Sequence, residues 1–261
     1  MNFYHIYGII LRYLYFYKKS LDHVFDAFYW PILDLSLWGL TSMYFIEQSP
    51  QTSPVLVIIV SAIVFWFIVY RCQYEISGSI LEELWNKNLV NIFVSPIQFV
   101  EWITAFLCLS LIKGTASFIF GVFIAYLFYK VSILSFGISI IPFVLILILS
   151  GWALGMFISG IILRHGSKIQ SFAWTLVWAV APFSAVYYPV SILPVWAQWI
   201  AYFLPTTYVF EGLRLFISSS QVSYHLLIPG AFLALLYFIL SFVFLKRSFN
   251  IVLDQGIVKV H

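Results

Sequence analysis

The sequence predicts an all-α integral membrane protein with six transmembrane helices, and two observations lead to this prediction. Hydrophobic residues make up 63% of the 261 residues and charged residues only 9%, with a mean hydropathy of +1.00. A soluble domain has about 25% charged residues, so this chain has too little polar material for a soluble surface. The charges also gather between six long apolar runs, and a helix needs about 20 apolar residues to cross a bilayer.

One transmembrane domain over residues 1–261 is predicted, because the six apolar runs use more than half of the chain and leave no room for a separate soluble domain. The net charge of +3 gives no support for nucleic-acid binding. The predicted spans cover residues 28–46, 55–70, 102–129, 138–163, 171–188 and 226–245.

Residues 1–20 precede the first span and are predicted to form an amphipathic helix at the membrane interface. Arg12 interrupts this aromatic-rich stretch and Lys18 and Lys19 end it, so it is too short and too charged to span comfortably. The alternative is a short cytoplasmic extension of the first span. The aromatic residues expected at headgroup depth are Phe3, Tyr4, Tyr7, Tyr13 and Tyr15.

The basic residues predict the orientation, because cytoplasmic loops of membrane proteins carry an excess of Lys and Arg. With both termini in the cytoplasm, only Lys130 and Arg214 fall on the outer side. The sequence therefore predicts a multi-pass protein of the cytoplasmic (inner) membrane with both termini inside. The cations on the inner side are Arg12, Lys18, Lys19, Arg71, Lys87, Arg164, Lys168, Lys246, Arg247 and Lys259.

Between the second and third spans, residues 75–96 have the apolar spacing of an amphipathic helix. Pro96 ends this helix, because the residue before a proline is pushed out of the helical region. On the cytoplasmic side, such a helix is either a docking surface for a soluble partner or a simple connection, and the residues alone leave both open. The polar face consists of Glu82, Glu83, Asn86, Lys87 and Asn91, and Trp85 lies on the apolar face.

Residues 189–214 are too apolar for an ordinary loop, and their prolines forbid one continuous helix. Short helices that dip back into the outer leaflet fit this composition, provided that protein or a cavity surrounds the irregular backbone. We interpret the region as an outer gate, although an aromatic belt is the commoner explanation for its tryptophans. Glu211 and Arg214 could pair on one helix face, and burial would let them hold the fold. The candidate gate residues are Pro189, Pro194, Trp196, Pro205, Glu211 and Arg214.

Asp34 and Lys113 are charges within predicted spans, where a charge costs at least about 2.5–3.5 kcal/mol at the helix centre on insertion scales. One interpretation is that the two side chains pair. The other is that Asp34 lies near the interface, while Lys113 extends its ammonium group to the headgroups. In the fourth span, Gly151, Gly155 and Ser159 recur every four residues, which favours close approach of another helix.

The order of these parts resembles the permease subunits of type-2 ATP-binding cassette (ABC) exporters, and the resemblance covers essentially the whole chain. Its most specific pieces are LEELWNKNLVNIFVSPI at residues 81–97 and SAVYYPVSILPVWAQWIAYFLPTTYVFEGLR at residues 184–214. The stretch FYWPILDLSLWG at residues 28–39 also looks like the first span of this family. The resemblance implies the fold of a type-2 ABC exporter permease.

The resemblance also implies a role for each part. Residues 75–96 would be the coupling helix that touches a separate ATPase subunit, and residues 1–20 would be the elbow helix beside it. Residues 189–214 would be the re-entrant element that closes the exit. The expected partners are the ATPase subunit, a second permease subunit in a homodimer, and the lipid bilayer. This chain is expected to bind no cofactor, with ATP and magnesium held by the ATPase.

The leading functional prediction is a permease that moves a drug, a lipid or a lipid-linked glycan, driven by ATP hydrolysis in the partner. The sequence contains no G-x-x-x-x-G-K-[ST] phosphate loop and no metal-ligand spacing, so the chain is not expected to be an enzyme itself. The alternative is an ion-coupled carrier or a membrane scaffold without an ATPase partner. A carrier would need several charges in its spans, and only Asp34 and Lys113 qualify.

Overall fold

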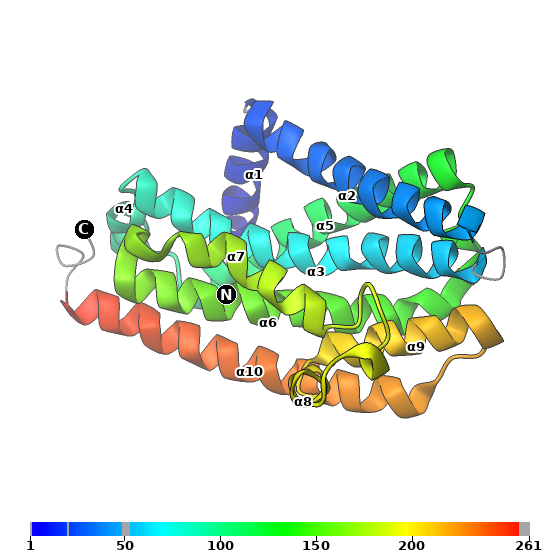
Figure 1. Ribbon diagram of the computed structural model, residues 1–261. Coiled ribbons are helices and arrows are strands. Elements are labelled where there is room, and N and C mark those ends of the chain that lie inside the picture. Colours follow the sequence, from blue (N-terminus) through cyan, green and yellow to red (C-terminus); the bar gives the residue numbers. More distant parts are fainter. Residues whose placement is uncertain (1, 20, 49–52, 256–261) are drawn as a thin grey trace.

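The computed structural model describes residues 2–19, 21–48 and 53–255, which form helices and short connections with no strand among them. Figure 1 shows α2, α3, α5, α6 and α10 packed along a common direction, with α1 running across them. The α-helices are α1 (Phe3–Lys19), α2 (Leu21–Gln48), α3 (Ser53–Trp85), α4 (Leu89–Val94), α5 (Phe99–Tyr129), α6 (Ile140–His165), α7 (Ser171–Val180), α8 (Val195–Tyr202), α9 (Pro205–Ser219) and α10 (Tyr224–Gln255).

Four stretches within the described residues are helical, long and apolar enough to cross a membrane. They cover Val55–Trp85, Phe99–Tyr129, Ile133–Ile169 and Tyr224–Asp254. The chain is therefore a multi-pass helical membrane protein, as predicted. The predicted span 28–46 lies within α2, which is not among these four, and Ser171–Phe183 is a shorter apolar helix. The count of six spans stays a prediction.

The long helices share two ends, which differ in charge (Figure 1). The connections from α3 to α5 and from α6 to α7 lie at one end, together with the end of α10. We call this the basic end, because its exposed cations are Lys87, Arg164, Lys168, Lys246 and Arg247. The α5–α6 connection, with Lys130, lies at the opposite end.

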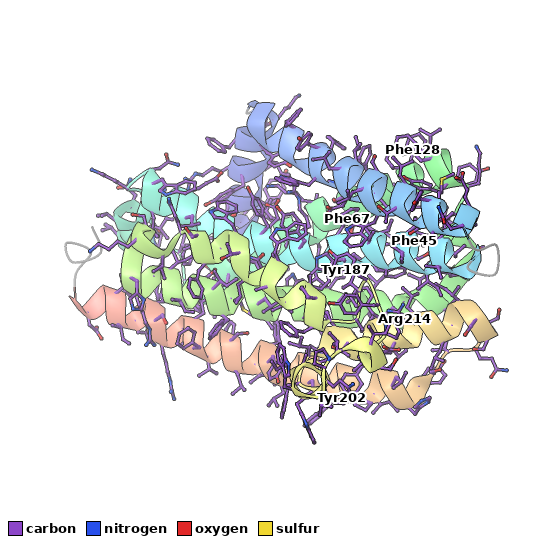
Figure 2. All side chains as sticks on the ribbon, viewed as in Figure 1. Phe45, Phe67, Phe128, Tyr187, Tyr202 and Arg214 are labelled. Carbon is purple, nitrogen blue, oxygen red and sulfur yellow. The ribbon has the colours of Figure 1, made fainter. Side chains whose placement is uncertain are left out.

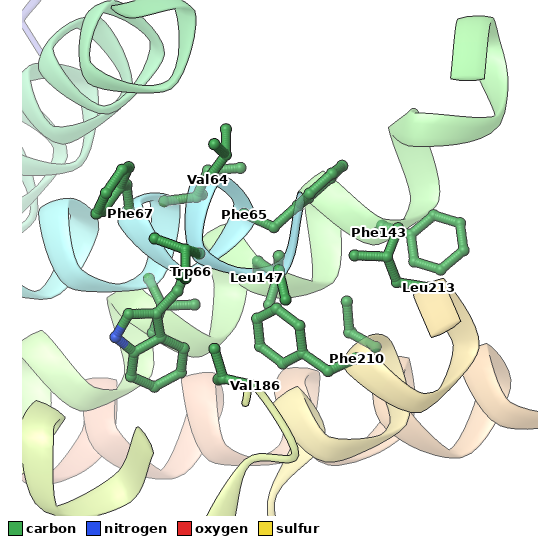
Figure 3. Close-up of a cluster of buried hydrophobic side chains, with 14 of the residues drawn as sticks. Val64, Phe65, Trp66, Phe67, Phe143, Leu147, Val186, Phe210 and Leu213 are labelled. Carbon is green, nitrogen blue, oxygen red and sulfur yellow. The ribbon is translucent and has the colours of Figure 1, made fainter. Parts of the chain in front are cut away.

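The core is centred on α3, which packs against α2, α5 and α6. In the most apolar window of α3, 67% of the residues are buried within the chain, against 22% for the window in α10. Figure 3 shows Phe65 and Trp66 of α3 beside Phe143 of α6 and Phe210 of α9, all almost fully buried. Helix α3 is therefore the central helix, whereas α10 leaves most of its surface for lipid or another subunit.

Glycines allow α3 and α6 to cross closely. A Cβ atom added at Gly151 would lie 2.7 Å from the Cβ of Cys72, and one added at Gly155 would lie 2.9 Å from the carbonyl oxygen of Gln73. Contacts this short cannot be accommodated without moving the backbone of α3. The small residues of the fourth predicted span therefore serve helix packing within this chain.

Two predicted helix boundaries differ from the structure. Residues 75–85 continue α3 and do not belong to a separate helix over 75–96, because no proline interrupts α3 after its first turn. A turn follows, in which Lys87 has a left-handed φ of 53°, and then the short helix α4. The helix predicted over 171–188 ends at Val180, and Pro182 lies in the 3-10 turn that follows it.

Candidate functional site

The most unusual polar feature is a set of three glutamates on α3 and α5 that are almost fully buried. Glu75, Glu83 and Glu101 are 3%, 1% and 2% exposed. Buried carboxylates are costly unless they are paired and hydrogen-bonded. Two of the three meet side chains of α1 directly, and the third meets two cations that contact Tyr17 of α1. We call these contacts the α1 clamp.

Glu83 forms the middle of the α1 clamp. The guanidinium of Arg12 lies 3.0 Å from Glu83 Oε1, and the side-chain amide of Asn88 donates to Oε2 at 2.5 Å. The hydroxyl of Tyr13 also donates to Oε1. Burial, and next the Glu83 carboxylate, raise the pKa of the Tyr13 phenol above its ordinary value, so the hydroxyl keeps its proton and remains a donor.

Glu101 provides the part of the α1 clamp that holds the start of α1. His5 Nδ1 lies 2.8 Å from Glu101 Oε2, and the backbone N–H of Asn2 donates to Oε1 at 2.5 Å. The same carboxylate accepts the backbone N–H of Gln98 at 3.1 Å, which closes a capping box at the start of α5. One carboxylate therefore both starts α5 and holds the first turn of α1.

Glu75 has two basic partners at the end of α1. Lys113 Nζ lies 2.6 Å from Glu75 Oε2, and Arg71 Nε lies 3.3 Å from Oε1. Arg71 also donates to the hydroxyl of Tyr17 at 2.5 Å, and Lys113 Nζ lies 3.9 Å from the centre of the Tyr17 ring. The interpretation that Lys113 pairs with Asp34 is therefore corrected: its ion-pair partner is Glu75.

The structure separates the predicted coupling residues into exposed and buried groups. Glu83 is corrected from the exposed polar face to the interior, and Glu82 is half-buried. Trp85 is 49% exposed, and its indole N–H donates to the side chain of Gln170 at 3.2 Å, which joins α3 to the α6–α7 connection. The other exposed members are Asn86, Lys87 and Asn91. We call Trp85, Asn86, Lys87 and Asn91 the coupling surface.

The burial of Glu83 could have been predicted from the spacing of apolar residues in the sequence. Ile76 and Ile80 precede it by seven and three residues, so these residues share one face of a continuous helix. A carboxylate on an otherwise apolar stripe predicts a buried partner. The same reasoning applies to Tyr13, which was expected at headgroup depth but lies buried with Ile6 and Ile9 of α1.

The predicted outer gate, residues 189–214, includes α8 and most of α9, and side chains of α9 bond to the irregular segment 181–193 that precedes α8. Glu211 accepts the backbone N–H of Val190 at 2.7 Å, and Arg214 donates to the carbonyl of Ala185 at 2.5 Å. Thr206 donates to the hydroxyl of Ser184 at 2.8 Å. Residues 181–193 contain little regular helix, and these bonds satisfy backbone groups that a helix would pair internally.

The remaining predicted gate residues delimit the short helices. Pro189 and Pro194 directly precede the 3-10 turn Val190–Ile192 and helix α8, and Pro205 begins α9. Trp196 is exposed on α8, and so is Tyr202 at the end of the same helix, which Figure 2 shows at the edge of the molecule. The pair Glu211–Arg214 is 3.9 Å apart, so these side chains contribute mainly through their bonds to the backbone.

Two further features of the interior were candidates for function: the carboxylate of Asp34 and clusters of side chains that could bind a metal ion. Asp34 has no ion pair within the part of the chain that the structure describes, and it lines a narrow crevice with Arg71, Trp30 and Trp178. The described residues contain no group of His, Cys, Asp and Glu that could hold a metal ion. The protein is thus a multi-pass helical membrane protein with an exposed basic end and, towards its other end, an irregular segment at residues 181–193. This architecture is suited to a membrane component of a transporter.

Comparison with protein families identifies the kind of transporter component. The family model described as ABC-2 type transporter matches residues 23–217, which is most of the chain. The chain therefore belongs to the ABC-2 type transporter family and is a type-2 ABC permease subunit. Permeases of this family are the membrane components of transporters and pair with an ABC ATPase subunit. A search of curated proteins gave no match.

Proposed function

We propose that this chain is the permease of an exporter that moves an amphipathic or apolar substrate, such as a drug, a lipid or a lipid-linked glycan, using ATP hydrolysed by a separate ATPase subunit. In this proposal six segments cross the cytoplasmic membrane, both termini and the basic end face the cytoplasm, and two permease subunits form a homodimer. The excess of cations at the basic end supports this orientation. ATP and magnesium are bound by the ATPase subunit alone.

The observation that carries the proposal is the continuity of α3. Its 33 residues run without a break from the opposite end to the coupling surface, about 50 Å at 1.5 Å per residue. Its apolar window is the most buried among the four candidate spans, so a movement of this helix would be transmitted to the packed core. A displacement of Trp85 by the ATPase would therefore move the core helix as well.

The α1 clamp supports the same mechanism. Because Arg12 and Tyr13 bind Glu83 on the last turns of α3, α1 is attached to α3 close to the coupling surface. We propose that α1, α4 and the end of α3 move together when the ATPase subunits close. The folded layer at residues 181–193, held by Glu211 and Arg214, would then separate from its counterpart in the second subunit to open the exit.

The test is purification of the full chain from its native membrane in mild detergent, followed by mass spectrometry of the copurified proteins. We expect a stoichiometric subunit that carries a phosphate-binding loop. The double variant Lys87→Glu/Asn91→Arg should reduce recovery of the ATPase subunit, because it changes the charge of the coupling surface. The chain should still fold, because both side chains are exposed and make no direct contact with the buried glutamates. The control Lys130→Glu changes an equally exposed cation at the opposite end and should leave recovery unchanged.

Two outcomes would contradict the proposal. If no ATPase copurifies at any detergent strength, the chain acts as a carrier or scaffold, and Asp34 becomes the next residue to test. If Lys130→Glu weakens ATPase recovery as much as the double variant does, the coupling surface has been placed at the wrong end of the molecule.

A further inference from the structure

An apolar groove lies between α6 and α10 and is also lined by Pro205 and Thr206 of α9. Its volume is about 390 Å³, within the range of about 300–1,000 Å³ that is usual for sites that hold small ligands. The floor is formed by the small side chains of Ala153 and Ser241, and the walls include Phe157 and Phe244. Pro205, the first residue of α9, closes part of it.

The side chains of the lining offer no free hydrogen-bond donor to a ligand. The hydroxyls of Ser150 and Ser241 donate to carbonyl oxygens of their own helices at 2.7 Å. The hydroxyl of Tyr237 donates to the carbonyl of Phe203 at 2.9 Å, and Thr206 is bonded to Ser184. No charged side chain lines the groove. A polar or charged ligand would therefore lose its own hydrogen bonds on entering without gaining replacements.

The groove lies halfway along two helices that could cross the membrane, so its opening faces the interior of the bilayer. Residues 150–157 lie in the middle of α6 and residues 237–244 in the middle of α10, and both helices are long and apolar enough to cross a membrane. Only 28% and 22% of the residues in their apolar windows are buried within the chain. Phe157 of α6 and Leu240 of α10, which line the groove, are themselves exposed on the surface of the chain. The groove is thus continuous with the surface that faces the bilayer hydrocarbon.

We propose that this groove is a binding site for one acyl chain of a membrane phospholipid. A hydrocarbon chain matches the apolar walls, and it would fill a space whose lining otherwise loses van der Waals contacts. The phospholipid headgroup would remain outside the groove, since the lining has nothing to bind it. The site requires only that α6 and α10 face lipid, so it does not depend on the transport function proposed above.

The test uses the full-length chain in vesicles that contain a phospholipid with a photoreactive diazirine in the middle of one acyl chain. After illumination, mass spectrometry maps the labelled peptides. We expect the label to concentrate on residues 150–157 and 237–244, and an excess of unlabelled phospholipid to compete for it. Equal labelling of the groove and of the exposed α10 residues Ile228 and Phe232 would overturn the proposal, as would protection of the groove by a second protein surface.

A substitution that fills the groove tests the site and can be matched with the same substitution outside the groove. Ala153→Trp places a large ring in the space, whereas the control Leu145→Trp adds the same ring at an exposed position of α6. We expect labelling of residues 237–244 to fall about tenfold in Ala153→Trp alone, equivalent to about 1.4 kcal/mol of binding free energy. Ser241→Leu fills the same space from α10 if the first variant does not fold. Unchanged labelling of residues 237–244 in a folded variant would contradict an acyl-chain site in this groove.

Discussion

Helix α1 and residues 181–193 are both attached to the long helices by polar contacts, but the two attachments differ in kind. In the α1 clamp, side chains of α1 contact the carboxylates of Glu83 and Glu101 across sequence separations of 70 to 96 residues. Residues 181–193 are instead held by α9 side chains that bond to backbone groups 21 to 29 residues away. The α1 clamp therefore concentrates its stability in a few buried carboxylates, whereas the outer layer distributes it over several hydrogen bonds.

The largest effect is expected from Glu83→Ala. Removal of this carboxylate leaves the Asn88 amide and the buried Tyr13 hydroxyl without their acceptor and Arg12 without its counter-ion. Hydrogen bonds to a charged group contribute about 1.5–3 kcal/mol each, and Glu83 accepts from Tyr13 and Asn88, so we expect a loss of about 3 kcal/mol. We expect α1 to become accessible to protease and the thermal midpoint to fall. Asp254→Ala, at an exposed position of α10, is the control, and equal stability of the two variants would show that the clamp does not hold α1.

A smaller and more local effect is expected from Glu211→Ala. The backbone N–H of Val190 would lose its acceptor, at a cost of about 1–3 kcal/mol for a buried donor. Hydrogen exchange should quicken in residues 181–193 and stay unchanged in α1. Glu211→Gln keeps an acceptor oxygen and should restore most of the protection. Faster exchange in α1 as well would mean that the two attachments are coupled.

Thr206→Val removes one hydroxyl and changes the side-chain volume little. The hydroxyl of Ser184 would lose its hydrogen-bonding partner Thr206 while keeping its own bond to Val180. We expect a loss of about 1 kcal/mol in the free energy of unfolding, which is typical of one hydrogen bond. Chemical denaturation in mild detergent measures this value. A loss as large as that of Glu83→Ala would contradict the distributed character of the outer layer.

The smallest effect is expected from His5→Ala, although His5 contacts a buried carboxylate. The imidazole is partly exposed, and Glu101 keeps the backbone N–H groups of Asn2 and Gln98 as donors. We expect a loss below about 1 kcal/mol, as for other exposed ion pairs, and a decrease of that small effect at high salt. Thermal unfolding at low and high ionic strength provides the comparison. A salt-independent loss of several kcal/mol would show that His5 is a main support of α1.

Patterns within short stretches predicted much of this fold. The apolar runs indicated the helices, and the distance of three residues between Glu211 and Arg214 placed both on one face of α9. The prolines correctly indicated that residues 189–214 do not form one helix. The glycine spacing at Gly151 and Gly155 predicted a close helix contact, although only the structure identifies α3 as the partner.

Contacts between distant segments could not be predicted in the same way. Lys113 and Glu75 are 38 residues apart, and their pairing depends on the rotation of α5 about its axis relative to α3. A helix pattern fixes which residues share a face, but it does not fix which helix covers that face. The end of α3 was misplaced for a related reason, because a charged segment after an apolar run looks the same whether the helix continues or a new one begins.

The α1 clamp has a consequence for biosynthesis. Translation produces α1 before α3 and α5, which carry its partners Glu83 and Glu101. Until then Arg12 and Tyr13 have no acceptor, and α1 must wait at the membrane surface with its aromatic residues against the headgroups. Docking of α1 therefore has to wait for α3 and α5, and a ribosome that stalls before residue 83 would leave Arg12 and Tyr13 without their acceptor.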